Sequence, residues 1–345
     1  MSKKIVATAV LLVVLAVVGW FAYQKFPQKA VFEPKAQPKK IGIMYRRQHM
    51  DALEGFKSGL KKQGYGDAIL DEVLIVASPT MDEDTKKATR KFLDEKVDLI
   101  FTTMEHDALG ALNVTKEMKN ETPIVFTTRF HDPEKFGLID SFRSSRNNAT
   151  GVATNLVEIV QKNLEFFKEI NPKIKKIGVF SEGFMVTAIG DAYLAELKAQ
   201  APRFGYTVVE YKTKVPPPET EKAWKEIAAK IKKGDIDALF HIAGHFVNPQ
   251  EKFESELAIR LGIPMAAPSE DLPNGGHFAY SDDFRDAAER AVVIADKIFK
   301  GTKPTNIPIE FVPKSFLTLN LKRAREAGIK FSDLMLDLAE VKIDE

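Results

Sequence analysis

The chain carries the same short motifs twice, in the same order. The paired motifs are KKIGI at 39–43 with KKIGV at 175–179, GY at 64–65 with GY at 205–206, and DLIF at 98–101 with DALF at 237–240. They recur about 140 residues apart, and self-similarity at a nearly constant offset indicates a duplicated structural unit. The sequence therefore predicts two similar lobes.

Within each half, short apolar runs alternate with segments whose apolar residues repeat at helical spacing. After the first run, Leu53, Phe56 and Leu60 share one helical face, and Gly64 is a stop signal. Such alternation produces a parallel sheet with helices on both faces, so we predict an α/β fold of two doubly wound parallel-sheet lobes joined by a hinge. The expected strands are 41–45, 73–76, 99–102, 124–127, 177–180, 208–211, 238–242 and 265–267.

The beginning of the chain predicts export. Lys3 and Lys4 precede an apolar stretch over 5–23, which as a helix approaches the ~30 Å thickness of the bilayer hydrocarbon. A cleavable signal peptide has a shorter apolar region that ends in a small-x-small site. Here Gly19 is followed directly by the large side chains of Trp20 and Phe21, which do not form such a site. We expect a retained transmembrane anchor, with a cleaved signal peptide as the alternative. Both place the remainder outside the cytoplasm, in the periplasm or on the outer cell surface.

Changes in composition and the repeat together divide the chain. The expected parts are a membrane anchor or signal segment at 1–25, a Pro/Lys-rich spacer at 26–39, a first lobe at 40–150 plus 282–303, and a second lobe at 151–281 plus 304–345. Hinge crossings are expected near 149–153 and 278–283, with 301–308 as a third.

Composition and the lack of motifs argue against several functions. The formal net charge is only +2 and no basic block stands out, so nucleic acid is not expected as a partner. There is no cysteine, which removes disulfides and thiol chemistry. The sequence has no Gly-x-Ser-x-Gly elbow and no Gly-rich phosphate loop, so we expect no enzyme activity and no cofactor.

A set of motifs from Lys40 onward carries a family resemblance. The motifs are Gly55-Phe56, Gly59-Leu60, Pro123-Ile124-Val125-Phe126, Asp132-Pro133, Gly137-Leu138, Asn148-Ala149-Thr150-Gly151-Val152, Lys176-Ile177-Gly178-Val179, Gly262-Ile263-Pro264, Lys300-Gly301, Asn320-Leu321-Lys322 and Gly328-Ile329. In this order and spacing the sequence resembles the ABC transporter substrate-binding family that includes tryptophan and tyrosine binders, a branch of the type I periplasmic binding proteins. The resemblance implies lobes that close on a small ligand and present it to a permease.

The sequence departs from the family where the ligand should lie. Glu105-His106 stand where the family tends to have Thr-Pro, and Phe184-Met185 stand where it tends to have Asn-Ser. Gly244 replaces a usual aspartate, while Asp283 falls where the family often has an acidic residue. The resemblance therefore extends to the scaffold, and an aromatic amino acid is not carried over as the ligand.

The loops after the strands mix aromatic, hydroxyl and charged side chains. This mixture suits a polar small molecule, because aromatic faces bury its apolar part, Arg and hydroxyl groups hold a carboxylate, and Glu105 or Asp283 pairs with an amine. The candidate ligand-binding residues are Tyr45, Arg46, Thr103, Glu105, Thr128, Arg129, Phe184, His245 and Asp283.

All six histidines lie in or beside these loops, at 49, 106, 131, 241, 245 and 277. A metal site is nevertheless not expected, because His241 and His245 at a strand end are separated by ~13 Å. An anion recognised by arginines and histidines is favoured instead.

These observations predict the extracytoplasmic solute-binding component of an ABC-type importer. It captures an amino acid or related organic acid by hinge closure, and its partners are the permease and ATPase subunits, with the membrane contacted through the N-terminal helix. The alternative is a ligand-sensing ectodomain partnered with a membrane signalling protein, since one fold serves several functions.

Overall fold

The structure is a computed structural model that describes residues 37–76, 78, 80–129, 132–182, 188–215, 219–242, 250–268, 272–273 and 275–344. The chain divides into two units, Met1–Pro38 and Lys39–Glu345. The expected N-terminal helix at 1–25 and most of the spacer lie outside the described residues, and so do Phe184 and His245.

The first lobe is built on a sheet whose described strands all run parallel. The six strands lie in the order β11-β5-β4-β3-β1-β2. Their bounds are β1 Lys40–Tyr45, β2 Ile69–Leu74, β3 Leu99–Thr102, β4 Ile124–Thr127, β5 Ala149–Ala153 and β11 Glu310–Phe311. Because the strands are parallel, all their carboxyl ends lie at one edge of the sheet.

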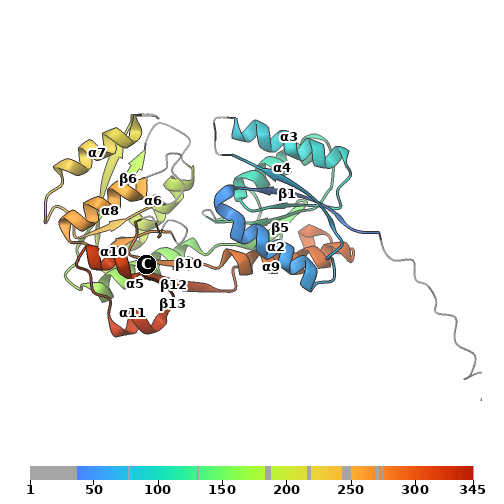
Figure 1. The fold of residues 1–345 in the computed structure, drawn as a ribbon. Helices are drawn as coiled ribbons and strands as arrows, with labels where there is room; N and C mark the ends of the chain where they lie inside the picture. Colours follow the sequence, from blue (N-terminus) through green and yellow to red (C-terminus); the bar gives the residue numbers. More distant parts are fainter. Residues whose placement is uncertain are drawn as a thin grey trace, which may run out of the picture. The chain divides into compact units, whose positions relative to one another are not determined.

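Helices cover both faces of this sheet because successive side chains of each strand point to opposite sides. Ile41 and Ile43 of β1 pack in a cluster with α2 (Met50–Lys62) and α9 (Phe284–Phe299), whereas Met44 packs in a cluster with α3 (Met81–Asp94) and α4 (Glu105–Glu117). In Figure 1 the blue α2 and the orange α9 lie side by side, although their sequences are far apart. The first lobe is therefore completed by a helix from late in the chain.

Glycines allow α2 and α9 to approach closely. A Cβ atom on Gly55 would clash with the backbone carbonyl of Arg285, and one on Gly59 would lie 2.9 Å from Cγ2 of Val292. Two helices whose backbones approach this closely bury a continuous apolar surface between them.

The second lobe contains a seven-stranded sheet among the described residues, in the order β13-β12-β10-β9-β8-β6-β7. Its pairs are parallel except for β10 with β12. The bounds are β6 Lys176–Glu182, β7 Thr207–Thr213, β8 Ala238–Phe240, β9 Met265–Ala266, β10 Phe278–Asp282, β12 Ser315–Asn320 and β13 Ala339–Ile343.

This sheet is also covered on both faces. Ile177 and Val179 of β6 lie in a cluster with α5 (Leu156–Ile170) and α6 (Ala188–Gln200), and Phe180 lies in a cluster with α7 (Thr220–Lys230) and α8 (Gln250–Leu261). The remaining described helices are η1 Arg47–His49, η2 Ala201–Phe204, η3 Pro304–Asn306, α10 Leu321–Glu326 and α11 Asp333–Leu338. The predicted fold of two doubly wound α/β lobes is confirmed.

Several expected boundaries are corrected. The whole of β5 (149–153) belongs to the first sheet, and β11 pairs with β5, so the segment 304–312 joins the first lobe and not the second. The third crossing consequently lies at 312–314, after β11, and not at 301–308. The strand expected at 73–76 is β2, which runs from Ile69 to Leu74. Its start was missed because the charged pair Asp71-Glu72 interrupts the apolar pattern of this edge strand.

We predict that Gly55→Ala lowers the free energy of unfolding, by about 1–3 kcal/mol, because the added methyl group must push α2 away from the Arg285 carbonyl. The matched control is Gly66→Ala, where the nearest atom outside the adjoining residues lies 3.7 Å from the new Cβ. Urea unfolding of the two purified variants measures the difference. Equal stability of the two variants would contradict the close approach of α2 and α9.

Candidate functional site

Three neighbouring strands of the first sheet end at one edge and bring most of the predicted site residues together. β1 ends at Tyr45, and the register pairs Met44 of β1 with Thr102 of β3 and Thr102 with Phe126 of β4. The residues that follow these strands therefore lie next to one another. They are Arg46 after β1, Thr103 and Glu105 after β3, and Thr128 and Arg129 after β4. Tyr45 is half-buried against the core shared with α2 and α9.

Arg46 is buried and its guanidinium is engaged within its own lobe. Nη2 and Nε donate to the two carboxylate oxygens of Asp107, at 2.9 and 3.3 Å, and Nη1 lies 2.9 Å from the sulfur of Met81. Asp107 also accepts from the Thr85 hydroxyl at 3.1 Å. Burial raises the pKa of Asp107, and the Arg46 guanidinium opposes that shift. Arg46 thus ties the end of β1 to α3 and α4.

Arg129 is buried at only 2 % exposure, but its carboxylate partner reaches the solvent. Nη2 donates to Oδ1 of Asp51 at 2.7 Å, and the Asp51 side chain is 45 % exposed. The guanidinium also lies over the ring of Phe284, 3.8 Å from its centroid. An aromatic face and a carboxylate hold the planar cation in one orientation.

The pKa of His49 reflects both its burial and the positive charge at this edge. Its Nδ1 lies 3.2 Å from the hydroxyl of Thr103, and its side chain is buried. Burial, followed by the positive charges of Arg129 and Arg46, holds the pKa of His49 well below its usual range. The imidazole is therefore neutral in the folded protein near pH 7.

Glu105 and Thr128 are both bonded to backbone groups of the same edge. Oε2 of Glu105 accepts from the backbone N–H of Arg129 at 3.0 Å, and the Thr128 hydroxyl accepts from the backbone N–H of Thr154 at 2.9 Å. Both side chains are fully buried. The edge thus presents a guanidinium and carboxylates close together, in fixed orientations.

Of the remaining predicted residues, the structure describes Asp283. Asp283 caps the amino end of α9, where its Oδ1 accepts from the backbone N–H of Asp286 at 3.0 Å. Phe184 and His245 lie outside the described residues. In the second lobe, His241 follows β8 and its Nδ1 lies 2.7 Å from Oε2 of the buried Glu254 on α8.

Sequence analysis did not single out the acidic partners of this site. Asp51 lies in the first turn of α2 and Asp107 in the first turn of α4, and both helices begin at the strand-end edge. Acidic residues are common in a first helical turn, since they complement the helix dipole. An acidic residue in the first turn of a helix that directly follows a candidate strand end was the sequence signal that could have identified both residues.

Of the described histidines, one lies far from the expected loops. His277 immediately precedes β10, so it is at the amino end of that strand, and its Nδ1 accepts from the backbone N–H of Met265 at 3.1 Å. The expectation that all six histidines surround the strand-end loops is therefore corrected. In the part of the chain that the structure describes, no group of three or more His, Asp or Glu side chains is arranged to hold a metal ion.

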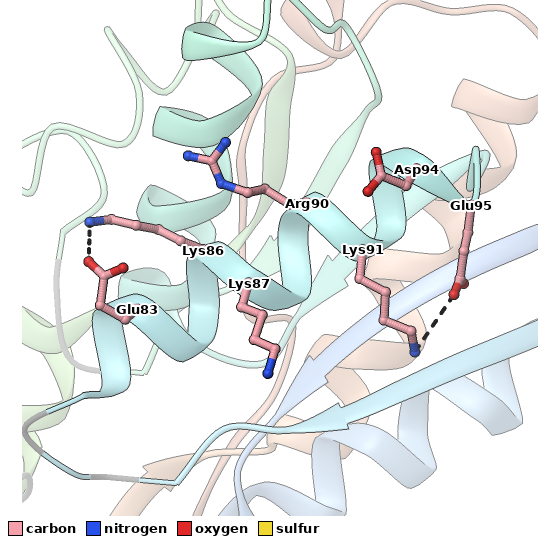
Figure 2. A pocket seen from close by; sticks show the side chains of 7 residues that line it. All are labelled: Glu83, Lys86, Lys87, Arg90, Lys91, Asp94 and Glu95. Atoms are coloured by element: carbon pink, nitrogen blue, oxygen red, sulfur yellow. Dashed lines mark hydrogen bonds and ion pairs between the residues drawn. The ribbon is translucent and has the colours of Figure 1, made fainter.

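Two surface hollows lie away from the strand-end edge. The first, about 470 Å³, is lined entirely by charged side chains, from α3 and from Glu95 directly after it. Figure 2 shows these side chains projecting from one helix, with Lys86 joined to Glu83 and Lys91 joined to Glu95. Ion pairs at i, i+3 and i, i+4 are typical of a solvated helix face, so this hollow carries no argument for a ligand.

The second hollow, about 530 Å³, lies at the amino ends of the strands of the second sheet. Its lining includes Ile174, Ile236 and Ile263, with Lys173, Lys233 and Lys330 among the polar groups. Ligands of open parallel sheets lie at the opposite, carboxyl edge. The candidate site is therefore the strand-end edge of the first lobe.

Comparison with known proteins identifies the family. The profile of the family described as ABC transporter substrate binding protein matches residues 43–343. The chain belongs to this family. A protein of Clostridioides difficile (strain R20291) described as tyrosine-binding protein is 27 % identical over 288 residues, which cover 82 % of this chain and 79 % of that protein. Membership places the chain among extracytoplasmic proteins that bind a small molecule for a transporter.

Solved structures share the fold. A conserved domain protein of Vibrio cholerae superposes with a TM-score of 0.74 at 20 % identity, over 89 % of this chain and 100 % of that one. A Streptococcus pneumoniae domain solved with L-Trp gives 0.74 at 20 % identity, over 88 % and 99 %. A ligand-free, open substrate binding protein of Clostridium difficile gives 0.71 at 24 % identity, over 89 % and 100 %. These likenesses confirm the type I periplasmic binding protein fold.

The expected membrane anchor falls on residues that the structure does not describe. Among the helices of the described residues, none is long and apolar enough to cross a bilayer.

We predict that Asp107→Ala destabilises the protein by about 3–5 kcal/mol, because it leaves the Arg46 guanidinium buried without its carboxylate. The control is Glu83→Ala on α3, which removes a solvent-exposed ion pair with Lys86 and leaves stability nearly unchanged. Chemical denaturation of both variants measures the effect. A small loss in Asp107→Ala would show that Arg46 does not depend on this carboxylate.

A second prediction concerns acid stability. Burial, with a smaller contribution from Arg323, lowers the pKa of His277 to about 4 in the folded protein, whereas an unfolded histidine titrates near about 6.5. As the pH falls, His277 therefore takes up its proton in the unfolded state before it does so in the folded state. The stability that depends on neutral His277 is fully present above pH ~6.5 and is lost as the pH falls toward ~4.

His277→Asn keeps an acceptor near the Nδ1 position for the Met265 N–H and does not titrate, so its free energy of unfolding should fall less steeply than that of the parent over this pH range. Urea unfolding at several pH values compares the slopes. Parallel curves for parent and variant would contradict the prediction.

Proposed function

We propose that the protein is the solute-binding component of an ABC importer and that its ligand is an amino acid or a related organic acid. It binds by closure of the two lobes on the ligand and it has no catalytic activity. The observation that carries this proposal is the Arg129–Asp51 pair, a buried, oriented guanidinium beside a partly exposed carboxylate at the strand-end edge. Family membership supplies the class of partner, a transporter.

The charges at this edge suit a zwitterion. A ligand carboxylate can accept from Arg129, while a ligand ammonium can donate to Asp51, whose exposed oxygens are accessible. The neutral state of His49 avoids adding a third cation beside the two guanidinium groups. Relatives described as a tyrosine-binding protein and as a domain in complex with L-Trp support an amino acid as the class of ligand.

The side chain of the ligand is a separate question. Glu105 and His106 stand where the family tends to have Thr-Pro, and Glu105 is buried beside Arg129. An acidic group near the ligand favours a side chain or head group that can donate hydrogen bonds. The proposed ligands therefore include polar and cationic amino acids besides the aromatic ones.

We also propose that residues 1–25 remain as a membrane anchor. Their apolar stretch is long enough to span a bilayer, and the Pro/Lys-rich spacer over 26–39 then holds the binding lobes at the outer surface. Mass spectrometry of the protein isolated from membranes tests this, since a cleaved signal peptide gives a mature chain that lacks the apolar stretch.

A thermal-shift screen against the twenty amino acids and a panel of organic acids tests the ligand class. A compound that binds only the folded state raises the apparent melting temperature, by an amount that grows with its concentration. Hits confined to sugars or nucleosides added as controls would overturn the proposal. Uptake of a labelled hit, measured in cells with and without the gene, then separates the importer from a sensor of the same ligand.

For the site itself, Arg129→Ala should weaken binding of the amino acid found in the screen by about tenfold or more, because the ligand carboxylate loses a charge-assisted bond. The control is Arg90→Ala on α3, whose guanidinium pairs with Glu117 at the surface. Isothermal titration calorimetry gives both dissociation constants, and melting temperatures show whether the variants remain folded. Equal affinity in parent and Arg129→Ala would place the ligand elsewhere.

A further inference from the structure

A single buried carboxylate joins the connections between the lobes. In the described part of the chain, three connections pass from one sheet to the other: β5 to α5 through Thr154, β10 to α9 through Asp282, and β11 to β12 through 312–314. Asp282 is the last residue of β10 and is only 4 % exposed. It therefore lies where the second connection leaves the second sheet.

The two oxygens of Asp282 accept from Thr154 in the first connection and from Ser315, the first residue of β12, which directly follows the third connection. Oδ2 accepts from the hydroxyl of Thr154 at 2.5 Å, and Oδ1 accepts from the hydroxyl of Ser315 at 2.7 Å. The second and third connections are also joined through their backbones, since the N–H of Asp283 donates to the carbonyl of Lys314 at 2.8 Å. The three connections thus form one hydrogen-bonded group, which we call the crossing cluster.

The crossing cluster contacts the candidate site directly. The backbone N–H of Thr154 donates to the hydroxyl of Thr128 at 2.9 Å, and Thr128 immediately precedes Arg129. Arg129 in turn lies over Phe284, which is two residues beyond Asp282 in the second connection. A group that binds at Arg129 is therefore connected to Asp282 by two routes, one through Thr128 and Thr154 and the other through Phe284.

Packing alone does not account for an acid at this position. Among the residues that the structure describes, Asp282 forms no ion pair, and burial raises its pKa while the hydrogen bonds from Thr154 and Ser315 oppose that shift. A buried carboxylate without a cation is unfavourable unless several donors hold it. An acceptor with two oxygens is what allows one residue to serve two donors from different connections.

We infer that Asp282 is the positioning residue of the hinge: it makes the three connections move as one body and couples that movement to the strand end that carries Thr128 and Arg129. The coupling to ligand rests on the proposed function, whereas the mechanical role does not. A hinge whose connections move together has few relative orientations of the lobes, so less conformational entropy is lost when the lobes close on a ligand.

The test measures the distribution of distances between the lobes. The chain has no cysteine, so Lys87→Cys on α3 and Lys230→Cys on α7, both exposed positions, accept spin labels in an otherwise unlabelled protein. Double electron–electron resonance of the full chain without ligand should give a distribution about twofold broader in Asp282→Ala than in the parent, because the connections are no longer tied together.

Asp296→Asn is the matched control. Asp296 also accepts from two side chains, the Tyr65 hydroxyl at 2.9 Å and the Lys300 ammonium at 2.8 Å, but all three residues belong to the first lobe. It should lose stability without any change in the distance distribution. Asp282→Asn should restore a narrow distribution, since its amide accepts from one hydroxyl and donates to the oxygen of the other.

If Asp282→Ala does not fold, Thr154→Val and Ser315→Ala each remove one donor and should each broaden the distribution. An unchanged ligand-free distribution in the folded variants, with melting temperatures lowered as in Asp296→Asn, overturns the inference and leaves Asp282 a structural residue.

The ligand arm uses L-tyrosine and L-tryptophan as probes. Adding either amino acid to the parent should narrow and shift the distribution of distances between the lobes. Asp282→Ala should bind the amino acid about tenfold more weakly, because fewer molecules have their lobes in the orientation that binds it. If neither amino acid moves the parent distribution, the aromatic amino acids are excluded as ligands, while the ligand-free comparison still decides the role of Asp282.

Discussion

The docking of α9 on α2 is the contact on which the rest of the structure depends. It is possible because Gly55 and Gly59 leave room for the backbone and side chains of α9. The helix arrives after the chain has built most of the second lobe, so completing the first core requires the chain to return. Where the chain returns to the first lobe, just before α9, Asp282 lies beside Thr154. Phe284, the first residue of α9, then lies against the Arg129 guanidinium. Core, hinge and site are thus joined by one helix.

The charges at the strand-end edge are held by partners before any ligand arrives. Arg46 is bound to Asp107 and Arg129 to Asp51, so neither guanidinium has to be reoriented on binding. The two pairs differ in burial, since Asp107 is enclosed whereas Asp51 is 45 % exposed. The first pair is therefore enclosed on both sides, whereas the second leaves the Asp51 carboxylate partly exposed beside a buried guanidinium.

The sequence predicted the scaffold well and the partners poorly. The duplicated motifs and the strand–helix alternation led to two doubly wound lobes, and the strand ends led to Arg46, Thr103, Glu105, Thr128 and Arg129 as neighbours. The edge strands β2 and β11 have few buried residues and gave weak patterns, so the start of β2 was missed and β11 was not predicted. Asp51, Asp107 and Asp282 were missed because an acidic residue near a helix start is common and its partner is distant in sequence.

By itself, the sequence determined the α/β class, the duplication and the edge of the sheet where polar side chains gather, because these depend on local periodicity and on the parallel direction of the strands. The tertiary structure decided which charged residues are paired, since the pairs of Arg46 and Arg129 join residues 61 and 78 positions apart. It also decided that β11 belongs to the first lobe and that the Asp282 carboxylate lies between Thr154 and Ser315. A pairing between distant residues follows from how the chain returns, and no local pattern encodes it.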